Sequence, residues 1–189
     1  MVVMDDHRGH GKSISTAYPN GYMIRGQELV DDEIMIARYM QEAYPDLKYC
    51  MLGHSMGSMI TRLCLRDNDN LLDKLIIMGT VPVNKFAWLG VFFANILCFY
   101  LGEKSESMLI DGVVGAKSLD FISYNKDNIS YKENDPLRIF KFRLGYSRAL
   151  IELNKMLGKK SKYKCQNPGL EIYNMVGEDD IITKGEKGV

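Results

Sequence analysis

The chain has 189 residues, of which 46% are hydrophobic and 25% are charged, as is typical of a folded globular protein and not of a disordered one. Its 24 basic and 24 acidic side chains balance, so no net charge favours nucleic acid as a partner. Four cysteines (Cys50, Cys64, Cys98 and Cys165) form no C-x-x-C motif, which predicts reduced thiols and a cytoplasmic protein.

Short apolar runs alternate with amphipathic segments over the first 80 residues. We predict strands at residues 2–4, 48–52 and 74–78, helices at 26–44 and 56–66, and a further strand at 170–176. Strands that alternate with helices through short loops indicate βαβ units. The predicted fold class is therefore α/β, with a parallel sheet and flanking helices.

The middle of the chain differs from its flanks in charge and in aromatic content. Residues 81–167 hold 14 Lys and Arg against 8 Asp and Glu, all seven Phe and the single Trp. This contrast predicts a core formed by residues 1–80 and 168–189, and a helical insertion at 81–167 with helices at 85–101, 105–109 and 137–157. Residues 86–102 carry no charge, but 17 residues are at the lower limit for a membrane span.

A G-x-S-x-G motif, Gly53-His54-Ser55-Met56-Gly57, lies between a predicted strand and a predicted helix. In this context the tight turn is expected to need small residues two before and two after the serine. It raises the Ser55 hydroxyl above the sheet edge as a candidate nucleophile. The following helix directs its N-terminal N–H groups to the same point, which makes the Met56 N–H a candidate oxyanion donor.

Two further motifs accompany this turn: D-H-R-G-H-G-K-S at residues 6–13 and G-E-D-D at residues 177–180. Together the three motifs resemble the α/β-hydrolase superfamily, specifically its monoacylglycerol lipase and lysophospholipase-like serine hydrolases. The resemblance covers residues 1–80 and 168–189. It implies that Ser55 is the nucleophile, that Asp180 is the acid of the catalytic triad, and that the insertion at 81–167 is the cap, or lid.

The catalytic base is the part of the triad that the chain does not supply in the expected order. Hydrolases of this fold carry serine, acid and histidine in that sequence, but His7, His10 and His54 all precede Asp180. We therefore expect the base and the second oxyanion donor to lie outside these residues, and the chain alone to be close to inactive. The parent protein is expected to hydrolyse carboxylic esters through an acyl-enzyme. The alternative is a non-catalytic protein of this fold that binds a ligand or partner.

The aromatic block at 81–167 has two open interpretations. It is either the packed core of the cap or a surface for an acyl chain, in which Trp88, Phe92 and Phe93 contact the substrate. The second predicts monoacyl lipid substrates and a peripheral membrane contact through the basic cap. The acidic residues 31–33 fall early in a helix, and 67–70 lack the glycine and glutamate of a calcium loop, so no metal or cofactor is predicted.

Overall fold

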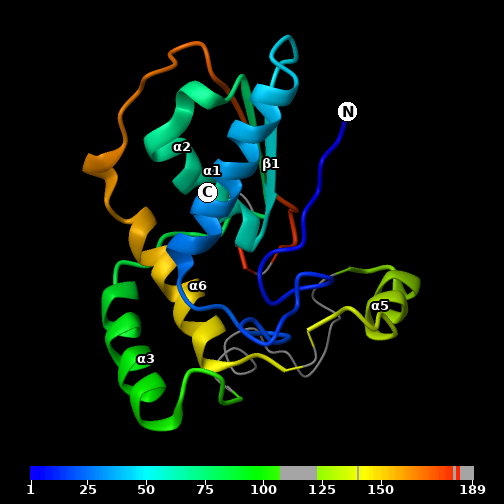
Figure 1. Ribbon diagram of the computed structural model, residues 1–189, viewed down its shortest axis with the longest axis vertical. Helices are drawn as coiled ribbons and strands as arrows, with labels where there is room; N and C mark the ends of the chain where they lie inside the picture. The colour runs from blue at the N-terminus through cyan, green and yellow to red at the C-terminus, as the bar shows by residue number, and fades with distance from the viewer. Residues whose placement is uncertain (107–122, 140, 181, 184–189) are drawn as a thin grey trace. The chain divides into compact units, whose positions relative to one another are not determined.

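A computed structural model describes residues 1–106, 123–139, 141–180 and 182–183 (Figure 1). In chain order its elements are α1 (Gly26–Ala43), β1 (Cys50–His54), α2 (Met56–Asn68), η1 (Asp69–Leu71), β2 (Lys74–Met78), α3 (Ala87–Leu101), α5 (Lys126–Glu133), α6 (Leu144–Leu157), η2 (Lys160–Lys162) and β3 (Glu171–Met175). Two compact units divide the chain: residues 26–88 with 150–189, and residues 1–25 with 89–149. The predicted division into core and cap stays a prediction.

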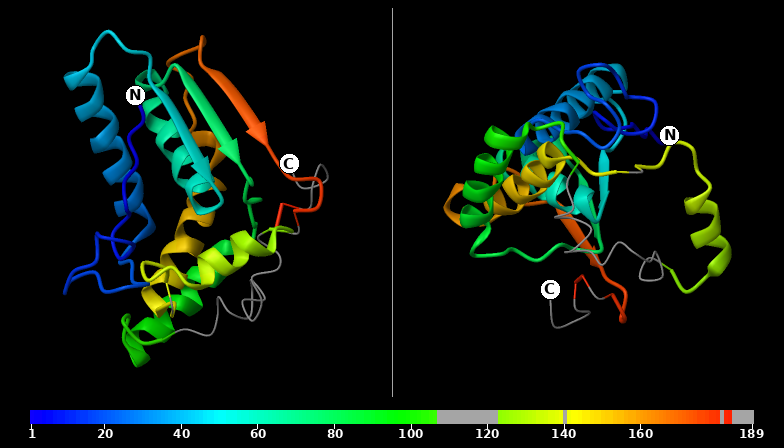
Figure 2. Two further views of the ribbon diagram at one scale, coloured as in Figure 1. Left: turned by 90° about the vertical axis from the view of Figure 1, so that its right-hand side faces the viewer. Right: turned by 90° about the horizontal axis from the view of Figure 1, so that it is seen from below.

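The sheet has the strand order β1-β2-β3, and both pairs of neighbouring strands are parallel. The register aligns Cys50 with Lys74 and Glu171 at one end, and continues to the last residue of each strand. The arrowheads of the three strands therefore lie at one edge, as the left view of Figure 2 shows. The α/β class with a parallel sheet and flanking helices is confirmed, although β1 begins two residues later than predicted.

Helix α2 packs on one face of this sheet, and α1 packs on α2. The strands explain the choice of face, because Met51, Leu75 and Ile77 alternate with more exposed residues and are at most 6% exposed. From α2, Ile60 and Leu63 are each 1% exposed. Each such side chain contributes about 1.5–3 kcal/mol when it is fully buried.

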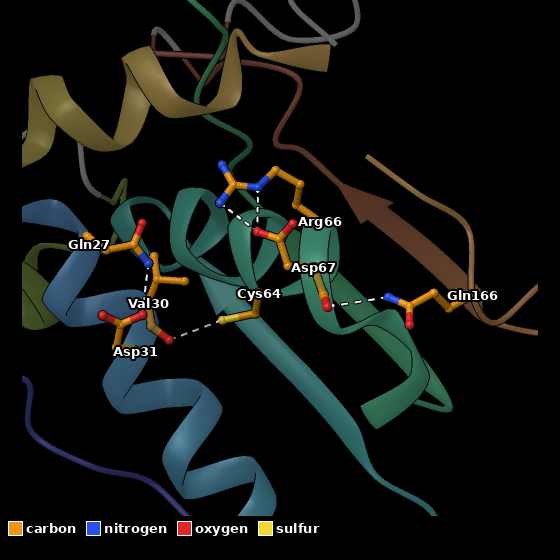
Figure 3. A network of polar contacts seen from close by, with 7 residues as sticks. All are labelled: Gln27, Val30, Asp31, Cys64, Arg66, Asp67 and Gln166. Atoms are coloured by element: carbon orange, nitrogen blue, oxygen red, sulfur yellow. Dashed lines mark hydrogen bonds and ion pairs between the residues drawn. The ribbon is translucent and has the colours of Figure 1, made fainter. Parts of the chain in front are cut away.

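Polar contacts join α1, α2 and the segment that enters β3 (Figure 3). The Cys64 thiol of α2 faces the carbonyl oxygen of Val30 in α1 at 3.8 Å, and burial raises the pKa of this thiol to about 12. One turn further along, at the C-terminal end of α2, the Gln166 side chain donates to the Asp67 carbonyl oxygen at 3.3 Å. The buried Asp69 carboxylate accepts from the Gln166 N–H at 2.7 Å, which ties the entry of β3 to the end of α2.

In the other unit, the segment at residues 20–25 is tied to Glu103 and α6 by polar contacts. Arg148, which is 2% exposed, donates to Glu103 Oε1 at 2.6 Å and to the Ile24 carbonyl oxygen at 2.7 Å. The Tyr22 hydroxyl donates to the other oxygen of Glu103 at 2.8 Å. The hydrogen bond from Arg148 lowers the pKa of Glu103, while burial and then Glu103 raise that of Tyr22 to about 12.

Three further predicted elements differ from the structure. The strand at residues 2–4 is wrong: these residues are exposed and belong to no strand of the described chain, because a strand forms only by pairing. The helix predicted from 137 begins at Leu144, since the backbone of Arg143 pairs instead with Glu106 and Gly21. Of the piece predicted at 105–109, residues 105–106 are not helical and 107–109 lie outside the described residues.

Helix α5 was not predicted from the sequence. Its N-terminus is capped by Asn125, whose side chain accepts from the Asp127 N–H at 2.8 Å. An asparagine followed two residues later by an acid is a start signal that the sequence did contain. No described helix combines the length and hydropathy that a transmembrane span needs.

Candidate active site

Ser55 occupies the turn between β1 and α2, in the predicted strand–turn–helix context. Its φ of 53° and ψ of −112° make it the non-glycine residue with positive φ in the described part of the chain. A side chain in that region costs about 1–3 kcal/mol and persists only where its surroundings hold it. The Ser55 N–H donates to the Met78 carbonyl oxygen of β2 at 3.0 Å, so the turn is fixed at the carboxyl edge of the sheet.

The two glycines of the motif are not equivalent. A Cβ at Gly53 would clash with the carbonyl oxygen of Gly57 and with the Thr61 side chain, so a larger residue is excluded there. A Cβ at Gly57 would meet no described atom within 4 Å beyond its own helical turn. We expected the turn to require a small residue two positions after Ser55. No contact in the described chain imposes that requirement at Gly57.

Met56 is the first residue of α2. The N-terminal N–H groups of a helix lack acceptors within the helix and form its positive end. The Met56 backbone is therefore on the element that best suits an oxyanion next to Ser55. Its role as a donor remains a prediction.

Asp180 lies just beyond β3, at the same edge of the sheet. Its Oδ1 accepts from the Ile182 N–H at 2.9 Å and the Thr183 N–H at 3.2 Å, which fixes the carboxylate in a turn. Asp180 is half-buried, whereas the neighbouring Asp179 is exposed. This difference in burial supports Asp180 over Asp179 as the acid that the G-E-D-D motif implies.

The strand end of β2 brings His54 and Asp180 close together. A Cβ at Gly79, whose φ is +54°, would lie 3.3 Å from His54 Nε2 and 3.6 Å from Asp180 Oδ2. Both groups therefore border the same small space beside Gly79. The next residue, Thr80, is hydrogen-bonded through its hydroxyl to the Asn174 side chain of β3, which joins the two strand ends.

The loop at residues 6–13 folds on itself. The Asp6 carboxylate accepts from the Lys12 N–H at 2.8 Å, and the His10 ring contacts the Arg8 carbonyl oxygen at 3.0 Å. The ring of His10 packs 5.6 Å from that of the buried Tyr146, and burial lowers the pKa of His10. These contacts give His10 a structural place within its own unit.

The three predicted substrate-binding residues all lie on α3 with their side chains exposed. Trp88 is 58% exposed, Phe92 55% and Phe93 54%, and the rings of the two phenylalanines contact edge-to-face at 5.5 Å. The buried stripe of the helix consists of smaller residues: Ala87, Val91, Ala94 and Cys98. Contact of the exposed residues with a substrate remains a prediction.

A parallel sheet whose first strand leads through a strained serine turn into a helix, with an acid after a later strand, is an α/β-hydrolase core. Residues 1–188 match the family model of the serine aminopeptidase family S33, and the chain belongs to that family. The resemblance predicted from the sequence motifs is confirmed at the level of family and fold.

Two relatives show how far the similarity extends. A monoglyceride lipase homolog of monkeypox virus is 27% identical over 164 residues, which cover 84% of this chain and 54% of the relative. The monoglyceride lipase of Mus musculus is 25% identical over 140 residues, which cover 72% of this chain and 43% of the relative. The chain thus spans about half the length of the curated relatives that it matches.

Among solved structures, a thermostable carboxyl esterase from Bacillus coagulans in complex with glycerol matches 97% of this chain, with a TM-score of 0.76 and 26% identity. The match covers 64% of that esterase. A monoacylglycerol lipase from Paleococcus ferrophilus matches 91% of this chain and 72% of its own, with a TM-score of 0.59 and 15% identity. The second likeness concerns the fold alone.

Proposed function

We propose that this chain supplies the nucleophile and the acid of a serine hydrolase that cleaves carboxylic esters through an acyl-enzyme. The observation that carries the proposal is the strained turn at Ser55, at the edge of the sheet where Asp180 also lies. Ser55 attacks the ester carbonyl, Asp180 orients the base, and the Met56 N–H stabilises the negative oxygen of the tetrahedral intermediate.

The base in this proposal is a histidine that is not among these 189 residues. His7, His10 and His54 all precede Asp180, whereas the order in this fold is serine, acid, histidine. The loss of a triad member lowers turnover by up to about a million-fold, and the loss of one oxyanion donor by about a hundred- to a thousand-fold. We accordingly propose that the chain alone is close to inactive and that the activity belongs to the full-length protein.

The proposed substrates are monoacyl lipids, such as monoacylglycerols or lysophospholipids. The matches to monoglyceride lipases support this class, as does the esterase whose structure contains glycerol. The exposed aromatic side chains of α3 supply apolar surface, on which each buried methylene of an acyl chain contributes about 0.8 kcal/mol.

We also propose a peripheral membrane contact through the cap and a cytoplasmic location. Phe92, Phe93, Phe99 and Tyr100 are all more than half exposed on a helix that carries no charge. Aromatic residues of this kind suit the boundary between lipid head groups and acyl chains. In the described chain none of the four cysteines is in a disulfide bond, which supports the cytoplasm.

A fluorophosphonate probe tests the central claim, because it labels only an activated serine. The full-length protein should be labelled at Ser55, the Ser55→Ala variant should not, and the 189-residue chain should be labelled far more slowly. A full-length protein that resists the probe, yet binds a monoacylglycerol, would indicate a non-catalytic ligand-binding member of the fold instead.

A further inference from the structure

Ser58, three residues after Ser55, has a hydroxyl that both donates and accepts a hydrogen bond. The side chain is 0% exposed, and its Oγ donates to the Ser55 carbonyl oxygen at 2.6 Å. The Ser58 N–H donates to the same oxygen at 2.9 Å. The hydroxyl in turn accepts from the Val81 N–H at 3.2 Å, and Val81 belongs to the loop that follows β2.

Arg62, one turn further along α2, makes a second link between the same two segments. Its Nε donates to the Ser58 carbonyl oxygen at 2.9 Å, and its Nη2 donates to the Val81 carbonyl oxygen at 2.6 Å. Val81 is thus held at both its N–H and its carbonyl group by side chains of α2.

The loop that receives these contacts is itself fixed. The Gly79 N–H donates to the Met175 carbonyl oxygen of β3 at 2.9 Å, and Thr80 is hydrogen-bonded to Asn174. Asn154 donates to the Pro82 carbonyl oxygen at 2.8 Å. A loop tied to β3 and α6 gives the contacts from α2 a firm anchor.

We infer that Ser58 and Arg62 are positioning residues that clamp the Ser55 turn to the loop after β2. This inference rests on the proposed function, because it explains how the nucleophile keeps its geometry. The φ of 53° at Ser55 is unfavourable for a residue with a side chain, and such a conformation persists only under external restraint. Without the clamp, the turn can relax to negative φ, which moves the Ser55 hydroxyl away from its reactive position.

An ordinary helical serine does not make this set of contacts. A serine within a helix commonly donates to a carbonyl three or four residues earlier, and this alone has no functional meaning. Ser58 differs because its hydroxyl also accepts an N–H from a separate segment, whose first residue, Gly79, borders Asp180. The clamp therefore relates the position of the nucleophile to the position of the acid.

The test compares Ser58→Ala, Arg62→Met and Arg62→Lys in the full-length protein. We expect Ser58→Ala to lower the rate constant for fluorophosphonate labelling of Ser55 about tenfold, and kcat in proportion, while KM is unchanged. Arg62→Met should have a smaller effect in the same direction. Arg62→Lys, which offers one donor nitrogen in place of the two that Arg62 uses, should lie between Arg62→Met and the unmodified protein.

Ser147→Ala is the matched control. Ser147 is 2% exposed in α6, and its hydroxyl donates to the Arg143 carbonyl oxygen at 3.4 Å. This variant also removes a buried helical hydroxyl, but one that holds no second segment, and it should keep the full labelling rate. Wild-type labelling of Ser58→Ala and Arg62→Met, or an equal loss of labelling in Ser147→Ala, overturns the inference.

If the unmodified protein is not labelled, the proposed function is refuted, but the positioning role of Ser58 and Arg62 can still be tested. Crystal structures of the unmodified protein and of Ser58→Ala then give the Ser55 φ in each, and amide exchange gives the protection of the Val81 N–H. A change of φ with faster exchange at Val81 supports the clamp. An unchanged φ near 53° in Ser58→Ala rejects it.

Discussion

Helices α2 and α3 have similar lengths, 13 and 15 residues, but they differ in which apolar side chains they bury. Helix α2 mixes polar and apolar residues, and it buries its large apolar ones against the sheet and α1. Helix α3 carries no charge, yet buries only small residues and leaves its aromatic rings exposed. The periodic pattern, and not the total hydrophobicity, therefore indicates which face is buried.

The difference bears on function because we propose different tasks for the two helices. In this proposal, the packed helix holds Ser55 in a conformation that the backbone does not favour. The exposed helix presents several neighbouring aromatic side chains, and we propose that this apolar surface contacts the substrate or a membrane. The predictions below test each side of this contrast.

The largest expected effect is at Ser55. Ser55→Ala and Ser55→Gly should each lower turnover of an ester by about a million-fold in the full-length protein. The free energy of unfolding should nevertheless be higher for Ser55→Gly than for Ser55→Ala, by about 1 kcal/mol, because glycine adopts positive φ without strain. Kinetics together with urea unfolding measures both. Equal stability of the two variants contradicts the strained turn.

The next effect is at the acid. Asp180→Asn should lower kcat about ten-thousand-fold, since the base then loses the group that orients it. Asp179→Asn is the matched control: Asp179 is the exposed neighbour and should leave kcat within a few-fold of the unmodified value. The reverse ranking of the two variants assigns the acid to Asp179.

The two helices can be compared directly by truncating one large side chain in each. Leu63→Ala, in α2, should cost about 2–5 kcal/mol of unfolding free energy, because Leu63 is 1% exposed. Phe92→Ala, in α3, removes a larger side chain that is 55% exposed, and should cost about 0.5 kcal/mol or less. A large loss in Phe92→Ala would mean that its ring is buried in the native protein.

The sequence predicted the sheet unit better than the rest of the chain, for physical reasons. The strand β2 contains a continuous apolar run at residues 75–78 next to turn residues, and its bounds, 74–78, were predicted to the residue. Helix α1 was predicted to within one residue because its apolar positions recur at helical spacing. By contrast, the start of α6 depends on pairing between Arg143 and distant residues, which no local pattern reveals.

The candidate site could likewise be predicted only in part, where local sequence determines the structure. The turn at Ser55 could be predicted because strand, glycine and helix all constrain it locally. Ser58 and Arg62 were not singled out, although Ser58 is a polar residue on the buried side of α2 and this was a usable signal. Their contacts reach Val81 in another segment, and only the folded chain brings that segment within hydrogen-bond distance.

The hydrogen bonds that Arg148 and Tyr22 donate to Glu103 give a smaller effect, a dependence of stability on pH, in the unit that contains most of α3. Its carboxyl has a lowered pKa in the folded state, so the stabilisation is present above the pKa of the unfolded chain, about 4.3, and is lost as the pH falls through the lower folded value. Glu103→Gln should flatten this acid dependence. At pH 7 it should cost no more than about 1 kcal/mol, because the side chain is 37% exposed and partly screened.

Thermal unfolding between pH 7 and pH 3 measures this effect. Glu106→Gln is the control, since Glu106 pairs with Lys141 at 2.7 Å but both side chains are more than 60% exposed. That variant should change the stability by a few tenths of a kcal/mol at most. If both variants show the acid dependence of the unmodified protein, the contact between Arg148 and Glu103 does not stabilise the folded state.

The smallest expected effect concerns the acyl chain of the substrate. If the exposed face of α3 contacts the acyl chain, kcat/KM of the full-length protein should rise with the acyl length of the ester. Phe92→Ala or Phe93→Ala should lower kcat/KM about threefold for long-chain esters and leave acetyl esters unchanged. The effect is modest because each ring is half-exposed, so a single truncation removes only part of the apolar contact.

Tyr131→Ala separates this role from a general effect of removing an exposed aromatic. Tyr131 lies on α5 and is 83% exposed, so the substitution removes a ring of similar size from another helix. It should leave the dependence on acyl length unchanged. A preference for acetyl esters in the unmodified protein, or the same response in Tyr131→Ala as in Phe92→Ala, rejects the acyl surface and leaves the packed cap as the better interpretation of the aromatic block.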